Sequence, residues 1–126
     1  HCTSLGKALL LDHTDEELRE LLKEYSFIQK TPHTITDLES FIKNLQAARE
    51  RGYTIDDREH EWAVRCVGAP IRDYSGKIIA AISVSGVADS FSPEKILEFG
   101  EKIQQTAAEI SRRMGYSGDI YKRKEL

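Results

Sequence analysis

The sequence has few cysteines, since Cys2 and Cys66 are the only two among its 126 residues. Two cysteines cannot build the disulfide framework that holds small secreted domains together, so a reducing cytoplasm is the expected compartment. Long hydrophobic runs are also lacking, because no uninterrupted apolar stretch approaches the roughly 18 residues that a membrane span needs. The sequence therefore predicts a cytoplasmic protein with no membrane partner.

A surplus of basic residues is absent as well. The 18 lysines and arginines are outnumbered by 21 aspartates and glutamates, which gives a formal net charge of -3. A domain that grips duplex DNA usually carries a basic surplus, so direct nucleic-acid binding by these residues is not expected. The 8 glycines are scattered and form neither a P-loop nor a dinucleotide-binding fingerprint. We therefore predict no cofactor.

The remaining composition is typical of one globular domain, with 40% hydrophobic and 31% charged residues. Helical spacing of apolar residues and helix-start signals predict helices over residues 4–11, 14–25, 36–51 and 93–114. In the first of these helices, Leu5, Ala8, Leu9 and Leu11 are the apolar positions. Thr14 with Glu17, and Thr36 with Glu39, are the spacings of capping boxes.

A β-rich hairpin over residues 62–86 organises the rest of the chain, and residues 53–56 form a short strand before it. The turn lies at Asp73–Gly76, and a loop of two or four residues there would place Cys66 opposite Ser83 and Val64 opposite Ser85. The expected core face carries Ala63, Arg65, Val67, Ala69, Ile78, Ala80, Ile82 and Val84. The opposite face carries Trp62, Val64, Cys66, Gly68, Ile79, Ala81, Ser83 and Ser85.

These elements predict an α+β fold, in which helices pack on the apolar face of a small antiparallel sheet. Three strands make a thin sheet for a domain of this size. We expect further strands upstream of His1, and an uncovered sheet edge that can pair with another chain.

Cys66 is the first candidate for chemistry, because a thiolate nucleophile needs a base within hydrogen-bond reach. His60 is the nearest histidine in sequence, but six residues of strand span about 20 Å. A base from His13 or His33 stays open, although no spacing supports one. A buried cysteine that lines a pocket is the simpler interpretation, so we predict no catalytic residue.

A metal site is the second candidate. The possible ligands are His1, Cys2, His60, Cys66 and the acids within residues 56–59. None of them falls into the paired spacings that are typical of metal ligands, so no metal site is predicted.

Ser83 and Ser85 share a predicted face with Cys66, and their hydroxyls can donate to a carboxylate or carbonyl oxygen. Asp56 could accept a hydrogen bond from a ligand hydroxyl, and free backbone N–H groups at the opening of the first helix favour anions. Together these groups suit a small oxygen-rich acid, such as a keto acid or a sugar acid. The alternative is that the serines are solvent-facing strand residues without a ligand.

An ordered set of short motifs resembles the effector-binding domain of IclR-type bacterial transcriptional regulators. The motifs are residues 1–10 (HCTSLGKALL), 34–36 (TIT), 49–53 (RERGY), 56–60 (DDREH), 65–70 (RCVGAP), 81–86 (AISVSG) and 108–115 (AEISRRMG). They run in order from His1 to about Gly115. The chain has Ser4-Leu5 where the family often has Gly-Ala, and these larger side chains alter the size of the pocket.

The resemblance implies a GAF-like effector domain over residues 1–115, followed by a polar tail over residues 116–126. It implies no catalytic role, a small carboxylate effector, self-association into a dimer or tetramer, and DNA binding only through a missing N-terminal winged helix-turn-helix. The effector-binding positions carried over are Ser4, Leu5, Asp56, Val64, Cys66, Ser83 and Ser85. A purely structural dimerisation module and a small Cys-dependent enzyme are the alternative functions.

Overall fold

A computed structural model describes residues 1–118 of the chain. In chain order, the elements are α1 (Ser4–Leu9), α2 (Asp15–Leu21), α3 (Leu38–Arg51), β1 (Thr54–Asp57), β2 (Val64–Arg72), β3 (Ile78–Val87), a short 3₁₀ helix (Ala88–Ser90) and α4 (Pro93–Arg113). Among the described residues, the strands form one antiparallel sheet in the order β1-β2-β3. The predicted α+β class is confirmed.

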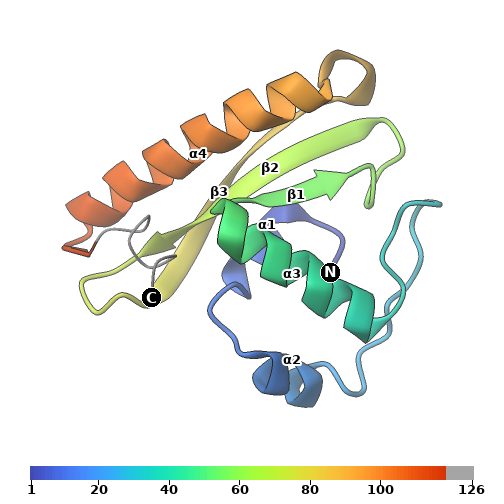
Figure 1. Cartoon of the computed structure of the whole chain (residues 1–126), viewed down its shortest axis with the longest axis horizontal. Helices are drawn as coiled ribbons and strands as arrows, with labels where there is room; N and C mark the ends of the chain where they lie inside the picture. Colours follow the sequence, from blue (N-terminus) through green and yellow to red (C-terminus); the bar gives the residue numbers. More distant parts are fainter. Residues whose placement is uncertain (119–126) are drawn as a thin grey trace.

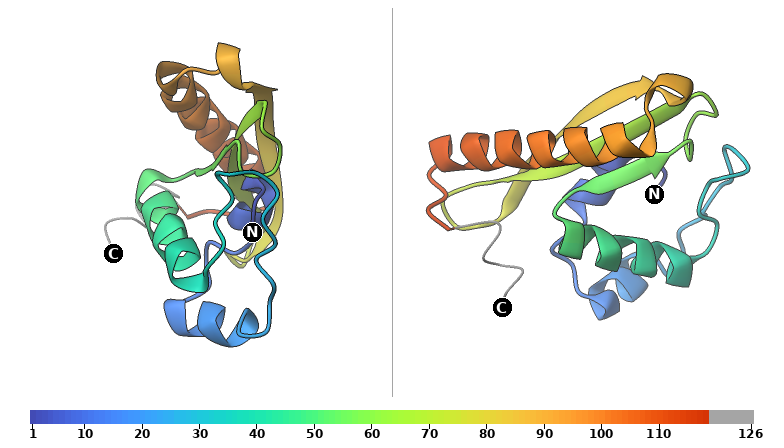
Figure 2. Two further views of the ribbon diagram at one scale, coloured as in Figure 1. Left: turned by 90° about the vertical axis from the view of Figure 1, so that its right-hand side faces the viewer. Right: turned by 45° about the horizontal axis from the view of Figure 1, so that its top comes forward.

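The helices cover both faces of the sheet. The long helix α4 runs along one face, and α1 lies against the other, with α3 and α2 beyond it (Figures 1 and 2). The sequence predicted helices on the apolar face only. The structure places α4 alone on that face, because its stripe of apolar residues matches the apolar side of β2 and β3.

The core between α4 and the sheet is the expected apolar face. Its buried residues are Tyr53, Val67, Ala69, Ile71, Phe91, Ile103 and Ala107. At Gly100 the backbone of α4 lies close to the ring of Tyr53, because an added Cβ there would lie 2.3 Å from Cζ of Tyr53. Met114, at the end of the expected stripe, is exposed and forms the C-cap of α4.

The predicted hairpin register is wrong by two residues. Cys66 lies opposite Ser85, Gly68 opposite Ser83, and Val64 opposite Val87. The turn closes with Asp73 N donating to Lys77 O at 3.0 Å, so the loop has three residues rather than two or four. Gly76 accommodates this loop in the left-handed region, at φ 86°.

A β-bulge then restores the alternation of faces. A loop of three residues would turn every later β3 side chain to the wrong face. The register changes between Ile71 and Arg72, which leaves Ile79 without a partner across the ladder. Beyond the bulge the predicted faces hold, but Ile78 packs in the cluster around α2 and α3 rather than in the α4 core.

The second apolar cluster holds α2 and α3 against the segment after α1. Its buried members are Leu11, Leu18, Phe41, Ile42, Leu45 and Ala48. The Thr14–Glu17 capping box is confirmed, but the N-cap of α3 is Asp37 rather than Thr36, and α2 ends at Leu21, well before Tyr25.

The described chain continues beyond α4 to residue 118. Tyr116 is buried and its N–H donates to Ser111 O at 2.9 Å, so the predicted tail is packed at its first residue. Residues 119–126 of that tail lie outside the described residues.

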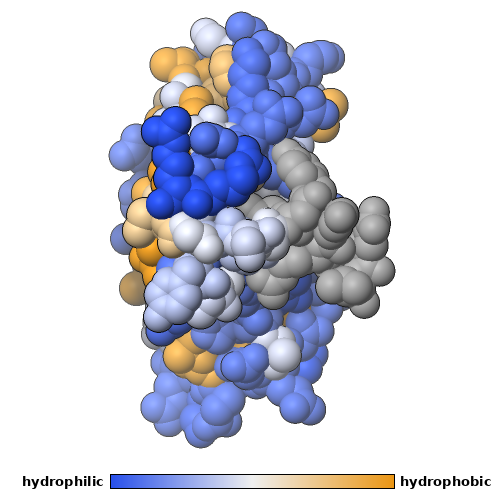
Figure 3. All heavy atoms as spheres, turned by 90° about the vertical axis from the view of Figure 1, so that its left-hand side faces the viewer, coloured by the Kyte–Doolittle hydropathy of each residue, from blue (hydrophilic) through white to orange (hydrophobic). Residues whose placement is uncertain are grey.

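Figure 3 views the end of the molecule at which α4 ends and the hairpin turn lies, and shows a largely hydrophilic surface with small apolar patches. None of the helices in residues 1–118 is long and apolar enough to cross a membrane.

Candidate functional site

One row of side chains crosses the sheet on the face opposite α4. Asp56 of β1 pairs with Cys66 of β2, which pairs in turn with Ser85 of β3. Residues that lie opposite each other in a sheet point to the same side, so these three side chains form a contiguous line. Asp56 and Cys66 are buried whereas Ser85 is exposed, so the row opens to solvent at its β3 end.

Helix α1 adds a fourth group to this row. The Oγ of Ser4 lies 2.7 Å from the Sγ of Cys66, and the Oγ of Ser85 donates to the same sulfur at 3.2 Å. Thr3 caps the helix by accepting from the N–H of Gly6 at 3.0 Å. The result is a thiol held between two serine hydroxyls.

The start of α1 is seated directly on the sheet. Thr54 Oγ1 donates to the carbonyl oxygen of Ser4 at 2.7 Å. Gly68 lies beneath the same carbonyl, and an added Cβ there would lie 3.0 Å from Ser4 O. A glycine at this position of β2 therefore allows the helix to approach the strand.

The carboxyl group of Asp56 accepts a hydrogen bond from the N–H of Glu59 at 2.8 Å. Burial raises the pKa of Asp56, an effect that the Glu59 N–H opposes and the neighbouring Glu59 carboxylate reinforces. Asp56 thus holds its proton to a higher pH than an exposed aspartate and can accept or donate a hydrogen bond toward the row.

A buried ion pair next to the row joins α1 to the loop after β1. Nζ of Lys7 donates to both carboxylate oxygens of Glu59, at 2.8 and 2.9 Å, and to Ile55 O at 2.7 Å. All three ammonium donors therefore have acceptors, which a fully buried lysine requires.

The remaining predicted positions lie around this row. Ser83 is in the next row along the sheet, opposite Gly68, and Val64 lies one row the other way, opposite Val87. Leu5 is in the first turn of α1, where backbone N–H groups have no intrahelical acceptor, but its side chain is exposed. The structure therefore gathers Ser4, Asp56, Cys66 and Ser85 closely and sets the other three at the periphery.

The sequence did not predict a role for Lys7, because the expected apolar face of α1 was the wrong one. The predicted apolar positions Leu5 and Leu9 are exposed, whereas Ser4, Lys7, Ala8 and Leu11 are buried. The spacing 4, 7, 8, 11 is itself the i, i+3, i+4, i+7 pattern of one helix face. A search of that face for polar residues would have found Lys7.

A small cavity of about 230 Å³ lies where β2 begins and β3 ends, and it is lined by Arg58, Trp62, Ala63, Arg65, Val87, Ala88 and Asp89. Arg58 and Arg65 line it, and their Nε atoms donate to Oδ1 of Asp57 at 3.0 and 2.8 Å. Burial acts to raise the pKa of Asp57, but the hydrogen bonds from the two arginines outweigh it and hold that pKa below its ordinary value. Arg65 also donates to Ala88 O and Phe91 O, and it belongs to the face of β2 opposite the row, so this cavity is not part of the row.

The contacts of Cys66 do not resemble those of an activated nucleophile. Its polar neighbours are the hydroxyls of Ser4 and Ser85 and a distant carbonyl of Val67. His60 instead lies with Nδ1 3.3 Å from Sγ of Cys2, a pair that the sequence did not predict. Within residues 1–118, no group of three or more His, Cys, Asp or Glu side chains could hold a metal ion.

Comparison with known proteins gives a consistent result over nearly the whole chain. The family described as "Bacterial transcriptional regulator IclR C-terminal" matches residues 1–112. The HTH-type transcriptional repressor AllR of Salmonella typhi is 39% identical over 115 residues. This alignment covers 91% of the chain and 42% of AllR, so the chain spans less than half the length of this relative.

Two solved structures show the same fold. The Agrobacterium tumefaciens repressor BlcR superposes with a TM-score of 0.88 at 37% identity, over 93% of this chain and 47% of BlcR. The inducer-binding domain of an Acinetobacter PobR double mutant, in complex with 3-hydroxybenzoic acid, superposes with a TM-score of 0.81 at 30% identity, over 88% of this chain and 64% of that one.

Proposed function

Because the chain belongs to the IclR family of bacterial transcriptional regulators, whose C-terminal domain it matches over residues 1–112, we propose that it senses a small carboxylate. The proposed binding residues are Ser4, Leu5, Asp56, Val64, Cys66, Ser83 and Ser85. The observation that carries the proposal is the row of Asp56, Cys66 and Ser85, which Ser4 of α1 closes from above.

The chemistry of the row suits a keto acid, a sugar acid or a hydroxy-substituted aromatic acid. The hydroxyls of Ser83 and Ser85 donate to the ligand carboxylate, and Asp56 accepts from a ligand hydroxyl. The PobR relative, an inducer-binding domain in complex with 3-hydroxybenzoic acid, supports a ligand of this class.

In the whole protein, we propose that ligand binding changes the affinity of an N-terminal winged helix-turn-helix for DNA. AllR, which this chain covers over 42% of its length, is named an HTH-type repressor. The net charge of -3 fits a sensing role for this part of the protein. The coupling between sensor and DNA-binding domain runs through self-association into a dimer or tetramer, which light scattering with and without ligand would measure.

The test is a thermal-shift and calorimetric screen of pyruvate, gluconate and 3-hydroxybenzoate, with pyruvamide as the uncharged analogue of pyruvate. A ligand that binds only the folded state raises the melting temperature with its concentration. We expect at least one acid to do so, pyruvamide to have no effect, and Ser85→Ala to weaken binding about tenfold, the loss of one charge-assisted hydrogen bond.

Ser90→Ala, another exposed serine outside the row, is the matched control and should bind as the unchanged chain does. If none of the acids raises the melting temperature, or if Ser85→Ala and Ser90→Ala bind equally well, the sensing proposal is wrong and a structural dimerisation module becomes the better interpretation. Fast alkylation of Cys66 by iodoacetamide near neutral pH would instead favour an enzyme.

A further inference from the structure

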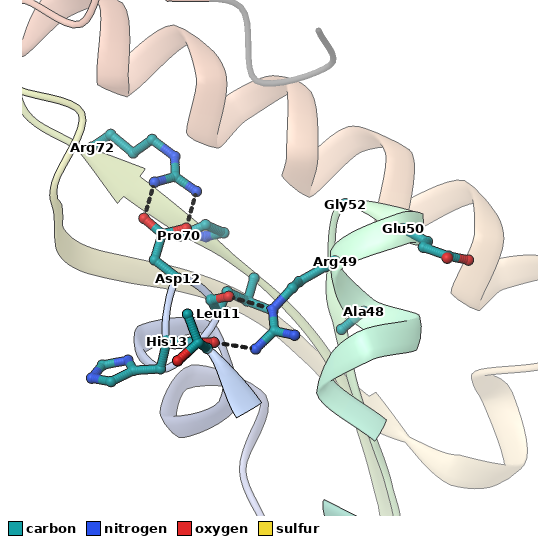
Figure 4. Close-up of a pocket in the computed structure, with 10 residues that line it drawn as sticks. Leu11, Asp12, His13, Ala48, Arg49, Glu50, Gly52, Pro70 and Arg72 are labelled. Atoms are coloured by element: carbon teal, nitrogen blue, oxygen red, sulfur yellow. Dashed lines mark hydrogen bonds and ion pairs between the residues drawn. The ribbon is translucent and has the colours of Figure 1, made fainter. Parts of the chain in front are cut away.

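A larger cleft lies at the opposite end of α1 from the proposed effector site. Its volume is about 630 Å³, within the range of small-molecule sites. It is lined by Leu11, Asp12, His13, Thr14, Ala48, Arg49, Glu50, Gly52, Pro70 and Arg72 (Figure 4). Six residues of helix, about 9 Å, separate it from Ser4.

Arg49 of α3 brings an accessible positive charge into this cleft. Its Nε donates to Leu11 O at 2.6 Å and its Nη2 donates to His13 O, so the guanidinium is fixed by two neutral carbonyls (Figure 4). Nη1 lies 3.6 Å from Asp15, longer than a hydrogen bond. Because a guanidinium has five N–H donors and this side chain is 31% exposed, donors remain for a ligand.

Arg72 forms the buried side of the cleft and is itself only 6% exposed. Its two terminal nitrogens donate to the carboxylate of Asp12, and Nη1 also donates to Gly76 O at 3.0 Å. Its Nε is buried without a hydrogen-bond partner, and so is Nδ1 of His13. Buried polar atoms usually have partners, so these two nitrogens are exceptions among the residues that line the cleft.

The floor of the cleft is apolar. Leu11, Ala48 and Pro70 are buried there, next to the arginines. Asp12 is occupied by Arg72, and Glu50 directs its carboxylate away from Arg49 (Figure 4). The site thus combines one accessible cation with an apolar surface.

We propose that this cleft is a second ligand site, which binds a small organic carboxylate with a short apolar body. The carboxylate lies against Arg49, and the apolar body lies against Leu11 and Pro70. This site is separate from the row around Cys66 and does not depend on the function proposed for that row.

The experiment is a titration of the ¹⁵N-labelled chain with benzoate, followed by amide shifts in two-dimensional NMR spectra. We expect saturable shifts for residues 11–14 and 48–52, and nuclear Overhauser contacts from the benzoate ring to Leu11 and Pro70. Inorganic phosphate, which has the charge without an apolar body, should bind the same residues more weakly. Shifts around Cys66 and Ser85 report the other site, so the two proposals succeed or fail separately.

Two variants on α3 test the role of charge. Arg49→Gln should weaken benzoate binding at the cleft about tenfold, whereas Lys43→Gln, which removes the same charge from an exposed position of α3 outside the lining, should leave it within about twofold. If Arg49→Gln does not fold, the nuclear Overhauser contacts of the benzoate ring in the unchanged chain still test the proposal, because they need no variant. The proposal is overturned if benzoate leaves residues 11–14 and 48–52 unshifted, or if Arg49→Gln folds and binds as tightly as Lys43→Gln.

Discussion

Ser4 and Cys66, 62 residues apart in the sequence, lie with Oγ and Sγ only 2.7 Å from each other. This contact exists because the first turn of α1 is seated on β2, where Gly68 presents no side chain and Thr54 donates to Ser4 O. The start of a helix and the middle of a strand thus become two walls of one site. The position of α1 is therefore the structural variable on which the proposed sensor depends.

Replacement of Gly68 by alanine tests whether α1 needs its close approach to β2. The new Cβ would lie 3.0 Å from O and 3.1 Å from C of Ser4, both backbone atoms that cannot rotate away. We expect a loss of about 1–3 kcal/mol in the free energy of unfolding, together with weaker acid binding. Urea denaturation measures the first. Ser83→Ala, on the strand directly opposite, is the control and should unfold like the unchanged chain. Equal stability of the two variants would show that α1 does not need this close approach to β2.

The buried Lys7–Glu59 ion pair and the exposed Lys102–Glu98 pair predict very different costs in stability when the lysine is replaced. Side chains of Lys7 and Glu59 are 0% and 8% exposed, whereas those of the Lys102–Glu98 pair are 63% and 55% exposed. Lys7→Met leaves a buried carboxylate without its partner and should cost about 3–5 kcal/mol in urea denaturation. Lys102→Met should cost about 1 kcal/mol or less.

The double variant Lys7→Met/Glu59→Gln separates the ion pair from other roles of Lys7. It removes both charges, so much of the lost stability should return. A double variant as unstable as Lys7→Met alone would show that the cost comes from packing and not from the orphaned charge.

The raised pKa of Asp56 predicts a pH dependence of stability. The folded state keeps the Asp56 proton above the ordinary pKa of 3.8, so the stabilisation is present below that pH and is lost as the pH rises through the raised pKa. Asp56→Asn removes this loss. Its unfolding free energy, relative to the unchanged chain, should therefore increase from acidic toward neutral pH.

Asp73 is a control for Asp56, because its pKa is shifted in the opposite direction. Hydrogen bonds from Ser75, whose hydroxyl contributes most, and from Lys77 lower the pKa of Asp73 in the hairpin turn, so its ionised form stabilises the fold above the ordinary pKa. Asp73→Asn should then lose stability relative to the unchanged chain as the pH rises. Urea denaturation over a pH series compares the two variants, and slopes of the same sign would contradict the assignment for Asp56.

At Gly100, helix propensity and packing have opposite effects on the stability of an alanine variant. Alanine in the middle of a helix is favoured over glycine by about 1 kcal/mol. At this position, however, the Cβ would meet three atoms of the Tyr53 ring at 2.3–2.7 Å, so we expect Gly100→Ala to lower the melting temperature. Gln105→Ala, at an exposed position of the same helix, should raise it slightly. A more stable Gly100→Ala would show that α4 can move away from the sheet without cost.

Local signals in the sequence were sufficient for much of the fold. The Thr14 capping box, the glycine stop of α3 at Gly52 and the Ser92-Pro93 start of α4 are confirmed, because each involves residues within one turn of helix. The grouping of Cys66 with Ser85 on one face is also confirmed, although the predicted register was wrong. The three-residue loop shifts the register by one residue, and the bulge at Ile79 shifts it by one more. The total shift of two residues is even, so each side chain stays on its predicted face.

By itself, the sequence determined which residues form helices and strands and which faces of the hairpin are apolar and polar, since propensity, caps and alternation act over a few neighbours. Only the tertiary structure decided that Ser4 meets Cys66, that Lys7 pairs with Glu59 and that Arg49 reaches the turn after α1. These contacts join residues 38 to 62 positions apart. The first two form because α1 packs through the face that carries Ser4 and Lys7, whose hydrogen-bond partners Cys66, Thr54 and Glu59 all come from distant parts of the chain, and this leaves Leu5 and Leu9 exposed.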